Sequence, residues 1–451
     1  MASIFDIFKP DPYLPEIEDK KEVDKLYHYW RIRIFYSMFI GYALYYFTRK
    51  SFTFAMPGLI VDLGFTKGQL GFLGTVLSLT YGLSKFISGV LSDRSNPRYF
   101  MAFGLIMTGV FNICFGLSSS LFMFTVFWAL NGWFQGFGWP PCARFLTHWY
   151  SHSERGSWWS SWNAGHNMGA FLIPWIVGFA LEYWGWRWAM FVPAGICIIG
   201  GLFLINRLRD TPQSLGLPPI EKYRDDYLAK DDADDKEERL SAKEILFDYV
   251  LKNKYIWVLA VAYFFIYTIR IGVGDWTALF LIETKGYSNL TANGTASLFE
   301  VGGVVGGLVA GWSSDYLFRA KRGPVNVLFA LSICMSILGF WYIPKEYYFL
   351  DSCMIFILGF SIFGPQMLIG VAAAELSHKK AAATSTGFIG WMAYVGAAVA
   401  GYPLGQITED WGWNGYFWSL IFCGIAAVLV LLPLWNVVNG PHVILKNKVE
   451  S

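Results

Sequence analysis

Two stretches, GYALYYFTRK at residues 41–50 and VAYFFIYTIR at residues 261–270, carry the same pattern Tyr-x-x-x-Tyr-x-x-Arg. The matching residues are Tyr42, Tyr46 and Arg49 in the first copy and Tyr263, Tyr267 and Arg270 in the second. Positions i, i+4 and i+7 share one face of a helix, so each copy directs two phenols and a guanidinium the same way. An arginine inside a membrane span costs about 2.5–3.5 kcal/mol, so both should face a wet or paired interior. The copies lie 221 residues apart (263 minus 42), which predicts two repeated halves with an anion site on their pseudo-two-fold axis.

The composition indicates a membrane protein. The chain of 451 residues is 55% hydrophobic, 19% aromatic and only 15% charged, whereas a soluble domain is about 25% charged. Twelve apolar segments have the length of about 20 residues that a bilayer requires. They lie at residues 34–56, 68–91, 99–118, 122–147, 158–181, 187–207, 256–281, 294–316, 324–343, 350–375, 384–407 and 414–437. We therefore predict an all-α membrane protein of twelve transmembrane helices in two pseudo-symmetric six-helix bundles.

One long polar stretch separates the two sets of spans. The predicted order is an N-terminal segment (1–33), a six-helix bundle (34–207), a linker that is partly helical near its end (208–255), a second bundle (256–438) and a tail (439–451). Lysine and arginine gather in the loops on the side of the linker, so both termini are expected to be cytoplasmic. The polar N-terminus predicts no cleavable signal peptide.

No basic run indicates a nucleic-acid partner. The six cysteines lack CxxC spacing, which favours a role in packing over a metal site or a disulfide.

A second repeat follows the second span of each half. SGVLSDRSNPR (88–98) matches AGWSSDYLFRAKR (310–322) at an offset of 222, since Asp93 aligns with Asp315. The motif residues are Gly89, Asp93, Arg94, Gly311 and Asp315. The small residue should let helix ends approach, and the aspartate should pair with helix termini and basic side chains. This G-x-x-x-D-R pattern is similar to the loop signature of the major facilitator superfamily, and a structural brace is the expected role.

The two repeated arginines favour phosphate as the anion. A guanidinium matches phosphate oxygens with two parallel hydrogen bonds, so Arg49 and Arg270 could grip one dianion. His166, with Asn163 three residues earlier on the same face, is a further candidate because its charge can change between pH 5 and 8. Lys85 could equally line the site or form a structural pair.

Three charges in or near the spans are expected to pair with one another, because an uncompensated charge there is costly. A Lys50–Asp275 or Lys50–Glu300 contact would join the halves, either as a bridge that breaks and re-forms or as a static brace. Aromatic and amide side chains are secondary candidates for a sugar-binding wall, although aromatic residues are common in this chain. These are Gln135, Trp139, Phe363 and Tyr394.

Four motifs, YFTRKSF, RGSWWSSWNAGHNMG, DTPQSLGLPPIE and FGPQMLIG, resemble the organophosphate:phosphate antiporter family of the major facilitator superfamily. The resemblance runs from about Tyr27 to about Asn436. It implies twelve helices, exchange of an organic phosphate for inorganic phosphate by rocker-switch alternating access, and an arginine pair on the first and seventh helices. Residue by residue, it implies phosphate-binding roles for Arg49, Arg270 and His166, ionic partners at Lys50, Asp275 and Glu300, and site tyrosines at Tyr42, Tyr46, Tyr267 and Tyr394.

Within that family, GYALYYFTRKSF (41–52), CARFLTHWYS (142–151) and AAAELSHKKAAATSTGF (372–388) are most similar to the hexose-phosphate receptor branch. Some members of that branch sense external glucose 6-phosphate and signal to a histidine kinase. Two departures are visible. Ala170 stands where the family usually has glycine, and Thr386 and Ile389 stand where the transporter branch carries an acid and a lysine.

We therefore expect a bacterial inner-membrane antiporter that exchanges a sugar phosphate, with glucose 6-phosphate the leading candidate, for inorganic phosphate or another sugar phosphate. No cofactor motif is present, and no enzyme activity is expected. The main alternative is a receptor that uses the same site and reports to a partner sensor kinase. A proton-coupled sugar symporter is weaker, because Asp275 and Glu300 are better used in ion pairs with Lys50.

Overall fold

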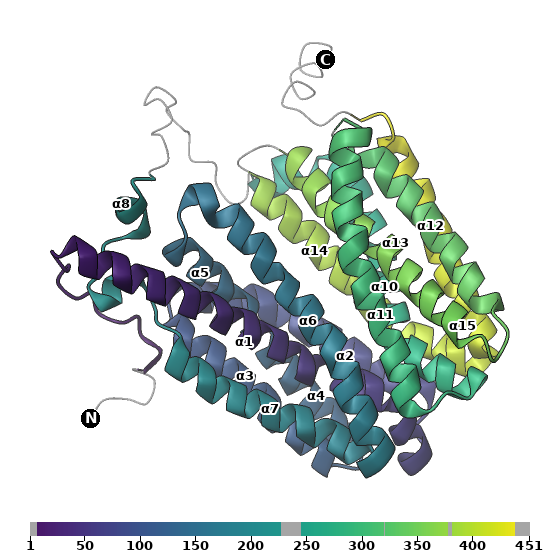
Figure 1. Cartoon of the computed structure of the whole chain (residues 1–451). Helices are drawn as coiled ribbons and strands as arrows, with labels where there is room; N and C mark the ends of the chain where they lie inside the picture. The colour runs from purple at the N-terminus through teal and green to yellow at the C-terminus, as the bar shows by residue number, and fades with distance from the viewer. Residues whose placement is uncertain (1–6, 227–244, 320, 378–380, 438–451) are drawn as a thin grey trace. The chain divides into compact units, whose positions relative to one another are not determined.

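The structure is a computed structural model that describes residues 7–226, 245–319, 321–377 and 381–437. Within these ranges every regular element is a helix (Figure 1), which confirms the all-α class. Contacts divide the chain into two compact units. The first holds Met1–Ala55 and Thr80–Glu237, and the second holds Met56–Leu79 and Glu238–Ser451. The predicted tail at 439–451 and the middle of the predicted linker lie outside the described residues.

The first unit is built from the first seven long helices. They are α1 (Lys20–Leu63), α2 (Lys67–Asp93), α3 (Pro97–Leu117), α4 (Leu121–Gln135), α5 (Trp139–Trp149), α6 (His152–Trp184) and α7 (Trp186–Arg207), of which the end of α1 and the start of α2 belong to the second unit. The predicted span at 122–147 contains a break in the helix, because α4 ends at Gln135 and α5 begins at Trp139. The break coincides with Gly136 and Gly138 and with the Pro140–Pro141 pair at the start of α5. Proline lacks the N–H that would continue the helical ladder.

The first part of the predicted linker packs against the N-terminal segment. It contains a 3₁₀ turn (Pro212–Leu215) and the short helix α8 (Ile220–Arg224). The backbone N–H groups of Leu14 and Ile17 donate to the carbonyls of Gln213 (3.0 Å) and Gly216 (2.8 Å). The rings of Tyr27 and Tyr223 stack with centroids 4.0 Å apart. These contacts attach this part of the linker to the first unit.

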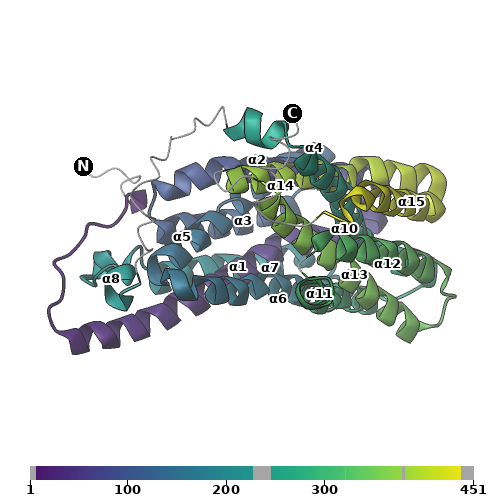
Figure 2. The same ribbon diagram turned by 90° about the horizontal axis from the view of Figure 1, so that it is seen from above.

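The second unit contains the remaining helices. They are a π-helical turn (Ile245–Leu251), α10 (Lys254–Lys285), α11 (Asn289–Trp312) with a π-helical extension (Ser313–Leu317), α12 (Arg322–Tyr342), α13 (Tyr348–Glu375), α14 (Ala382–Val399), α15 (Tyr402–Leu431) and a 3₁₀ turn (Leu432–Leu434). Helices α11 and α13 lie side by side (Figures 1 and 2). A Cβ at Gly302 or Gly306 would overlap the carbonyl oxygen of Phe356 or Phe360, so only glycine permits this approach.

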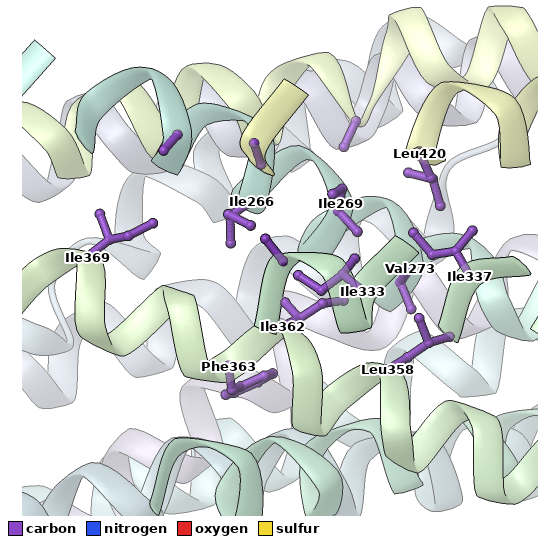
Figure 3. Close-up of a cluster of buried hydrophobic side chains, with 14 of the residues drawn as sticks. Ile266, Ile269, Val273, Ile333, Ile337, Leu358, Ile362, Phe363, Ile369 and Leu420 are labelled. Carbon is purple, nitrogen blue, oxygen red and sulfur yellow. The ribbon is translucent and has the colours of Figure 1, made fainter. Parts of the chain in front are cut away.

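Branched aliphatic side chains fill the centre of the second unit. Figure 3 shows Ile266, Ile269 and Val273 of α10 within a cluster to which α12 and α13 contribute Ile333 and Ile362. The spacing of three and four residues places the α10 members on one face. This packing determines the rotation of α10. Tyr267 is about 100° around the helix from Ile266 and points away from the apolar stripe, whereas Arg270 lies at the edge of that stripe, where it contacts Phe363.

Nine stretches of the described chain are long and apolar enough to cross a membrane. One of them, Thr384–Leu434, includes both α14 and α15, in which Gly412 has a left-handed φ of 66°. Helices α4 and α5, with 15 and 11 residues, are each too short to qualify alone. The predicted spans at 384–407 and 414–437 therefore meet at Gly412, where glycine tolerates the turn because it lacks a Cβ.

Candidate functional site

The rotation of α1 is determined by polar contacts on its buried face. The hydroxyl of Tyr45 donates to the carbonyl of Met101 at 2.8 Å, and the hydroxyl of Ser51 donates to Asn112 Oδ1 at 3.1 Å. Both residues are fully buried against α3. Since Tyr45 faces α3, the next residue, Tyr46, projects about 100° further around α1 and therefore away from α3. The helical period predicted that Tyr42, Tyr46 and Arg49 share one face of α1, and the contacts of Tyr45 and Ser51 with α3 determine which way that face points.

The Arg49 guanidinium lies between two phenol rings. Its Cζ is 4.4 Å from the ring centroid of Tyr46 and 4.5 Å from that of Tyr81 on α2. Its Nε donates to Gln135 Oε1 of α4 at 3.1 Å. A cation over aromatic faces is stabilised by about 0.5–2 kcal/mol per contact, with the larger values at desolvated sites. The Nε hydrogen bond and the two rings together determine the orientation of the guanidinium plane.

Gln135 is itself held by a buried amide network. Its Nε2 donates to Thr48 Oγ1 and to Asn131 Oδ1, both at 3.1 Å. Asn131 Nδ2 contacts the Thr48 carbonyl at 3.3 Å and Asn112 Oδ1 at 3.4 Å. Every member of this network is at least 99% buried. Buried polar groups in such a network must keep their partners, so the network defines one orientation of Gln135.

Aromatic residues connect α1 with α6. Tyr42 packs on Trp162 with ring centroids 4.8 Å apart, and Tyr46 lies 5.9 Å from the His166 ring. The His166 Nδ1 is in hydrogen-bond contact with the backbone oxygen of Asn163. The predicted grouping of Tyr42, Tyr46 and His166 is therefore present within the first unit. For Asn163 the contact involves its backbone, while its side chain position is exposed.

Lys85 and Trp139 also come together, since the Lys85 Nζ lies 5.4 Å from the Trp139 ring centroid. Lys85 is four residues after Tyr81, so both face the same way on α2. The second helix therefore contributes to the surroundings of Arg49. Tyr81 and Trp162 were not among the predicted site residues. The sequence signals for them were their spacings of four residues, Tyr81 from Lys85 and Trp162 from His166.

The second unit repeats the arrangement with different partners. The Arg270 Cζ lies 5.3 Å from the Tyr267 ring centroid and 4.8 Å from that of Phe363, and its Nη1 donates to the Tyr267 hydroxyl at 3.3 Å. Tyr267 packs against Tyr394 and Tyr263, with centroids 6.2 and 4.9 Å away. Each of the two predicted arginines therefore contacts at least one predicted aromatic residue of its own unit, Tyr46 for Arg49 and Tyr267 with Phe363 for Arg270.

The predicted ionic partners lie in different units. Lys50 follows Arg49 on α1, whereas Asp275 and Glu300 lie on α10 and α11 of the second unit. Their pairing remains a prediction.

A different ion pair is present inside the second unit. The Lys67 Nζ lies 3.0 Å from Glu283 Oε2, which also accepts a hydrogen bond from Trp413 Nε1 at 3.0 Å. The Lys67 backbone N–H donates to Glu409 Oε2 at 2.7 Å. The Thr75 hydroxyl donates to the Ala398 carbonyl at 2.6 Å. These contacts attach the start of α2 to the second unit, an attachment that sequence reasoning missed.

The loop motifs have unequal outcomes. Asp315 accepts a hydrogen bond from Arg322 Nη1, and the Arg322 Nη2 donates to Glu375 Oε1 at 2.8 Å, so the expected pairing with a basic side chain is confirmed in the second copy. Among the described atoms none lies within 4 Å of a Cβ placed at Gly89, so the expected close approach of helix ends in the first copy stays a prediction. Arg94 is exposed, and the Asp93 side chain is outside the described part.

No group of three or more metal-ligating side chains is present among the described residues. What the two arginine sites offer is positive charge, phenol hydroxyls and apolar ring faces. This combination suits an anion that carries a ring or a hydroxylated carbon skeleton.

Comparisons with known proteins agree with this chemistry. Residues 38–401 match the family model described as Major Facilitator Superfamily. The chain is 59% identical over 440 residues to the "Probable hexose phosphate transport protein" of Chlamydia trachomatis, covering 95% of this chain and 96% of that protein. It is 50% identical over 424 residues to the "Membrane sensor protein UhpC" of Salmonella typhimurium, with 94% and 95% coverage. A solved bacterial homologue of the human lysosomal transporter Spinster has a TM-score of 0.70 at 15% identity, covers 90% of this chain and 95% of its own, and supports the fold alone.

Proposed function

The chain belongs to the major facilitator superfamily, in its organophosphate:phosphate antiporter branch, and on that premise we propose that it exchanges a sugar phosphate for inorganic phosphate or another sugar phosphate. Glucose 6-phosphate is the leading substrate. The protein is an integral membrane protein, and we place it in the bacterial inner membrane with both termini in the cytoplasm.

The observation that carries the proposal is the matched pair of arginine sites. In both units a guanidinium lies over two aromatic rings and uses one N–H to contact a neutral partner, Gln135 or Tyr267. A hydrogen bond to a neutral oxygen orients a guanidinium and does not itself offset the positive charge, whereas one to a carboxylate does. Guanidinium has five N–H donors, so its fork can donate hydrogen bonds to the phosphoryl oxygens of a substrate.

Coupled exchange follows from electrostatics. Two arginines that act on one substrate repel each other, and a phosphate dianion offsets that repulsion. A carrier with bound anion is then expected to change conformation more readily than an empty one. His166, Lys85 and the site tyrosines would contribute donors to the phosphoryl group and the sugar.

The proposal is tested with purified protein in proteoliposomes that are loaded with inorganic phosphate or unlabelled sugar phosphate, by following uptake of labelled glucose 6-phosphate. Uptake should require the internal phosphate compound. Arg49→Lys and Arg270→Lys should each lower exchange about 10- to 150-fold, because a hydrogen bond to a charged group is worth about 1.5–3 kcal/mol and an ammonium lacks the fork.

The matched control is Arg187→Lys. Arg187 is half-buried, donates from Nη2 to Ser119 Oγ at 3.0 Å, and lies over the Trp186 ring with its Cζ 4.5 Å from the centroid, so its contacts are not with the residues around Arg49 or Arg270. It should exchange at the wild-type rate. Undiminished exchange by Arg49→Lys and Arg270→Lys would refute the guanidinium fork as the phosphate-binding element.

A receptor is the second candidate, because the similarity to a membrane sensor protein covers nearly the whole chain. A receptor would bind labelled glucose 6-phosphate with the same dependence on Arg49 and Arg270 and would give no uptake. The uptake and binding measurements on one preparation therefore separate the two functions.

A further inference from the structure

An apolar groove of about 660 Å³ lies on the second unit, away from Arg270 and its aromatic neighbours. Its walls come from three helices: residues 264–268 of α10, the last residue of α14, and residues on both sides of Gly412 in α15. The lining residues are Phe264, Phe265, Thr268, Val399, Pro403, Leu404, Ile407, Trp411, Asn414, Gly415, Trp418, Ser419, Leu420, Phe422 and Cys423.

The groove owes its shape to the turn at Gly412. Before the turn, the Trp276 Nε1 donates to the carbonyl of Ala400 at 3.0 Å; after it, the Tyr416 hydroxyl donates to the carbonyl of Gly272 at 3.2 Å. The two arms of the chain therefore both lie against α10. The left-handed φ of 66° at Gly412 reverses the chain between them and leaves the groove where the arms face each other.

The walls are unsuited to a water-soluble ligand. Only three of the fifteen lining residues are polar, and two of these use their hydroxyls on backbone carbonyls. Thr268 donates to Phe264 and Gly396 at 2.9 and 3.1 Å, and Ser419 donates to Gly415 at 2.8 Å. The groove lies within two apolar stretches, Lys254–Lys285 and Thr384–Leu434, that are long enough to span a membrane. An open apolar groove at this depth is in contact with hydrocarbon, not with water.

The open side of the groove is rich in aromatic surface. Trp411, Trp418 and Phe422 are 73%, 60% and 67% exposed. An acyl chain that lies between these rings and α10 restores the dispersion contacts that the empty groove lacks. Lipid tails are as apolar as the groove itself, so hydrophobicity alone gives little preference for one lipid over another. Any selectivity must come from the headgroup.

The residues beside Trp411 supply a negative charge for a headgroup. Asp410 is exposed, and the Gln406 Nε2 donates to its two carboxylate oxygens at 3.0 and 3.1 Å. Gln406 is uncharged, so it holds the carboxylate in place without neutralising it. An ammonium group supplies three N–H donors to such a carboxylate and is attracted to the face of an indole such as Trp411. Tryptophan is also the residue that prefers the depth of the headgroups.

We propose that this groove binds one phospholipid with a primary ammonium headgroup, of the phosphatidylethanolamine class. The acyl chain lies along Phe264, Trp418 and Phe422, and the ammonium group binds Asp410. The proposal does not depend on which substrate the two arginines bind.

The test uses the full chain reconstituted in vesicles that contain equal amounts of phosphatidylethanolamine, phosphatidylglycerol and phosphatidylcholine with identical acyl chains. The protein is extracted in mild detergent, and the lipid it retains is measured by native mass spectrometry. Wild-type protein should retain phosphatidylethanolamine at least fivefold over either other lipid. Asp410→Asn, a surface change, should reduce that preference to less than twofold.

Ser419→Phe fills the groove and should lose the retained lipid of every class. Leu429→Phe is its matched control, because Leu429 is 61% exposed on the same helix and does not line the groove; it should behave as wild type. Three results would overturn the proposal: retention in the ratio of the vesicle lipids, unchanged retention by Asp410→Asn, or a second protein copy that occupies the groove, seen as a dimer without bound lipid.

Discussion

Gln135 offers the sharpest test of how Arg49 is held. Gln135 is 1% exposed, accepts from the Arg49 Nε at 3.1 Å, and receives its own orientation from Thr48 and Asn131. Gln135→Leu keeps the size of the side chain and the helical propensity of α4 but removes the acceptor. The substitution also removes the donor to Thr48 Oγ1 and Asn131 Oδ1. Asn131 keeps its contacts with the Thr48 carbonyl and with Asn112, so we expect a less stable protein that still folds.

The expected magnitude follows from the bond that is lost. A hydrogen bond to a charged group contributes about 1.5–3 kcal/mol, which corresponds to about 10- to 150-fold in affinity. If the bond serves to orient Arg49 toward the substrate, KM for sugar phosphate should rise within that range while kcat changes little. Gln135→Glu should impair exchange more than Gln135→Leu, because a carboxylate neutralises the guanidinium and competes with phosphate.

The assay is the initial rate of exchange in proteoliposomes over a range of external substrate concentrations. Asn326→Leu is the control, since Asn326 is another amide side chain, 1% exposed, on α12 of the other unit. A KM for Gln135→Leu within twofold of wild type would refute the orienting role. An equal rise for the control would assign the effect to general damage.

Two further predictions concern stability. Asp351→Asn should lower the free energy of unfolding by about 3–5 kcal/mol, because it leaves Lys285 buried without its anionic partner (side chains 2% and 0% exposed). The double variant Lys285→Met with Asp351→Leu replaces the ion pair with apolar side chains and should recover most of this loss. Thermal melting in detergent measures the stability of both variants. Burial raises the pKa of the Asp210 carboxyl above its ordinary 3.8, although Arg144 Nη2, 3.0 Å away, lowers it. The native state therefore binds this proton more tightly than the unfolded state, so stability from this group is present below pH 3.8 and declines as the pH rises through the native pKa. Asp210→Asn should reduce the dependence of the melting temperature on pH between pH 3 and 6. An unchanged dependence would contradict the assignment of this pH effect to Asp210.

The sequence by itself determined the helical class, the apolar spans and the two Tyr-x-x-x-Tyr-x-x-Arg faces, because these depend on composition and on the local period of the helix. It also sufficed to place Arg49 and Arg270 beside tyrosines of their own helices, since residues four and three positions apart on one helix must share a face.

Only the tertiary structure decided which residues from other helices meet that face. Tyr81 and Gln135 reach Arg49 because α2 and α4 pack beside α1 at a particular height and rotation, which no local pattern specifies. The same holds for Lys67 and Glu283, which are separated by more than two hundred positions and pair through the register of packed helices. A one-residue change in that register rotates a helix by about 100°, since one turn has 3.6 residues, and would break every such contact while leaving the sequence pattern intact.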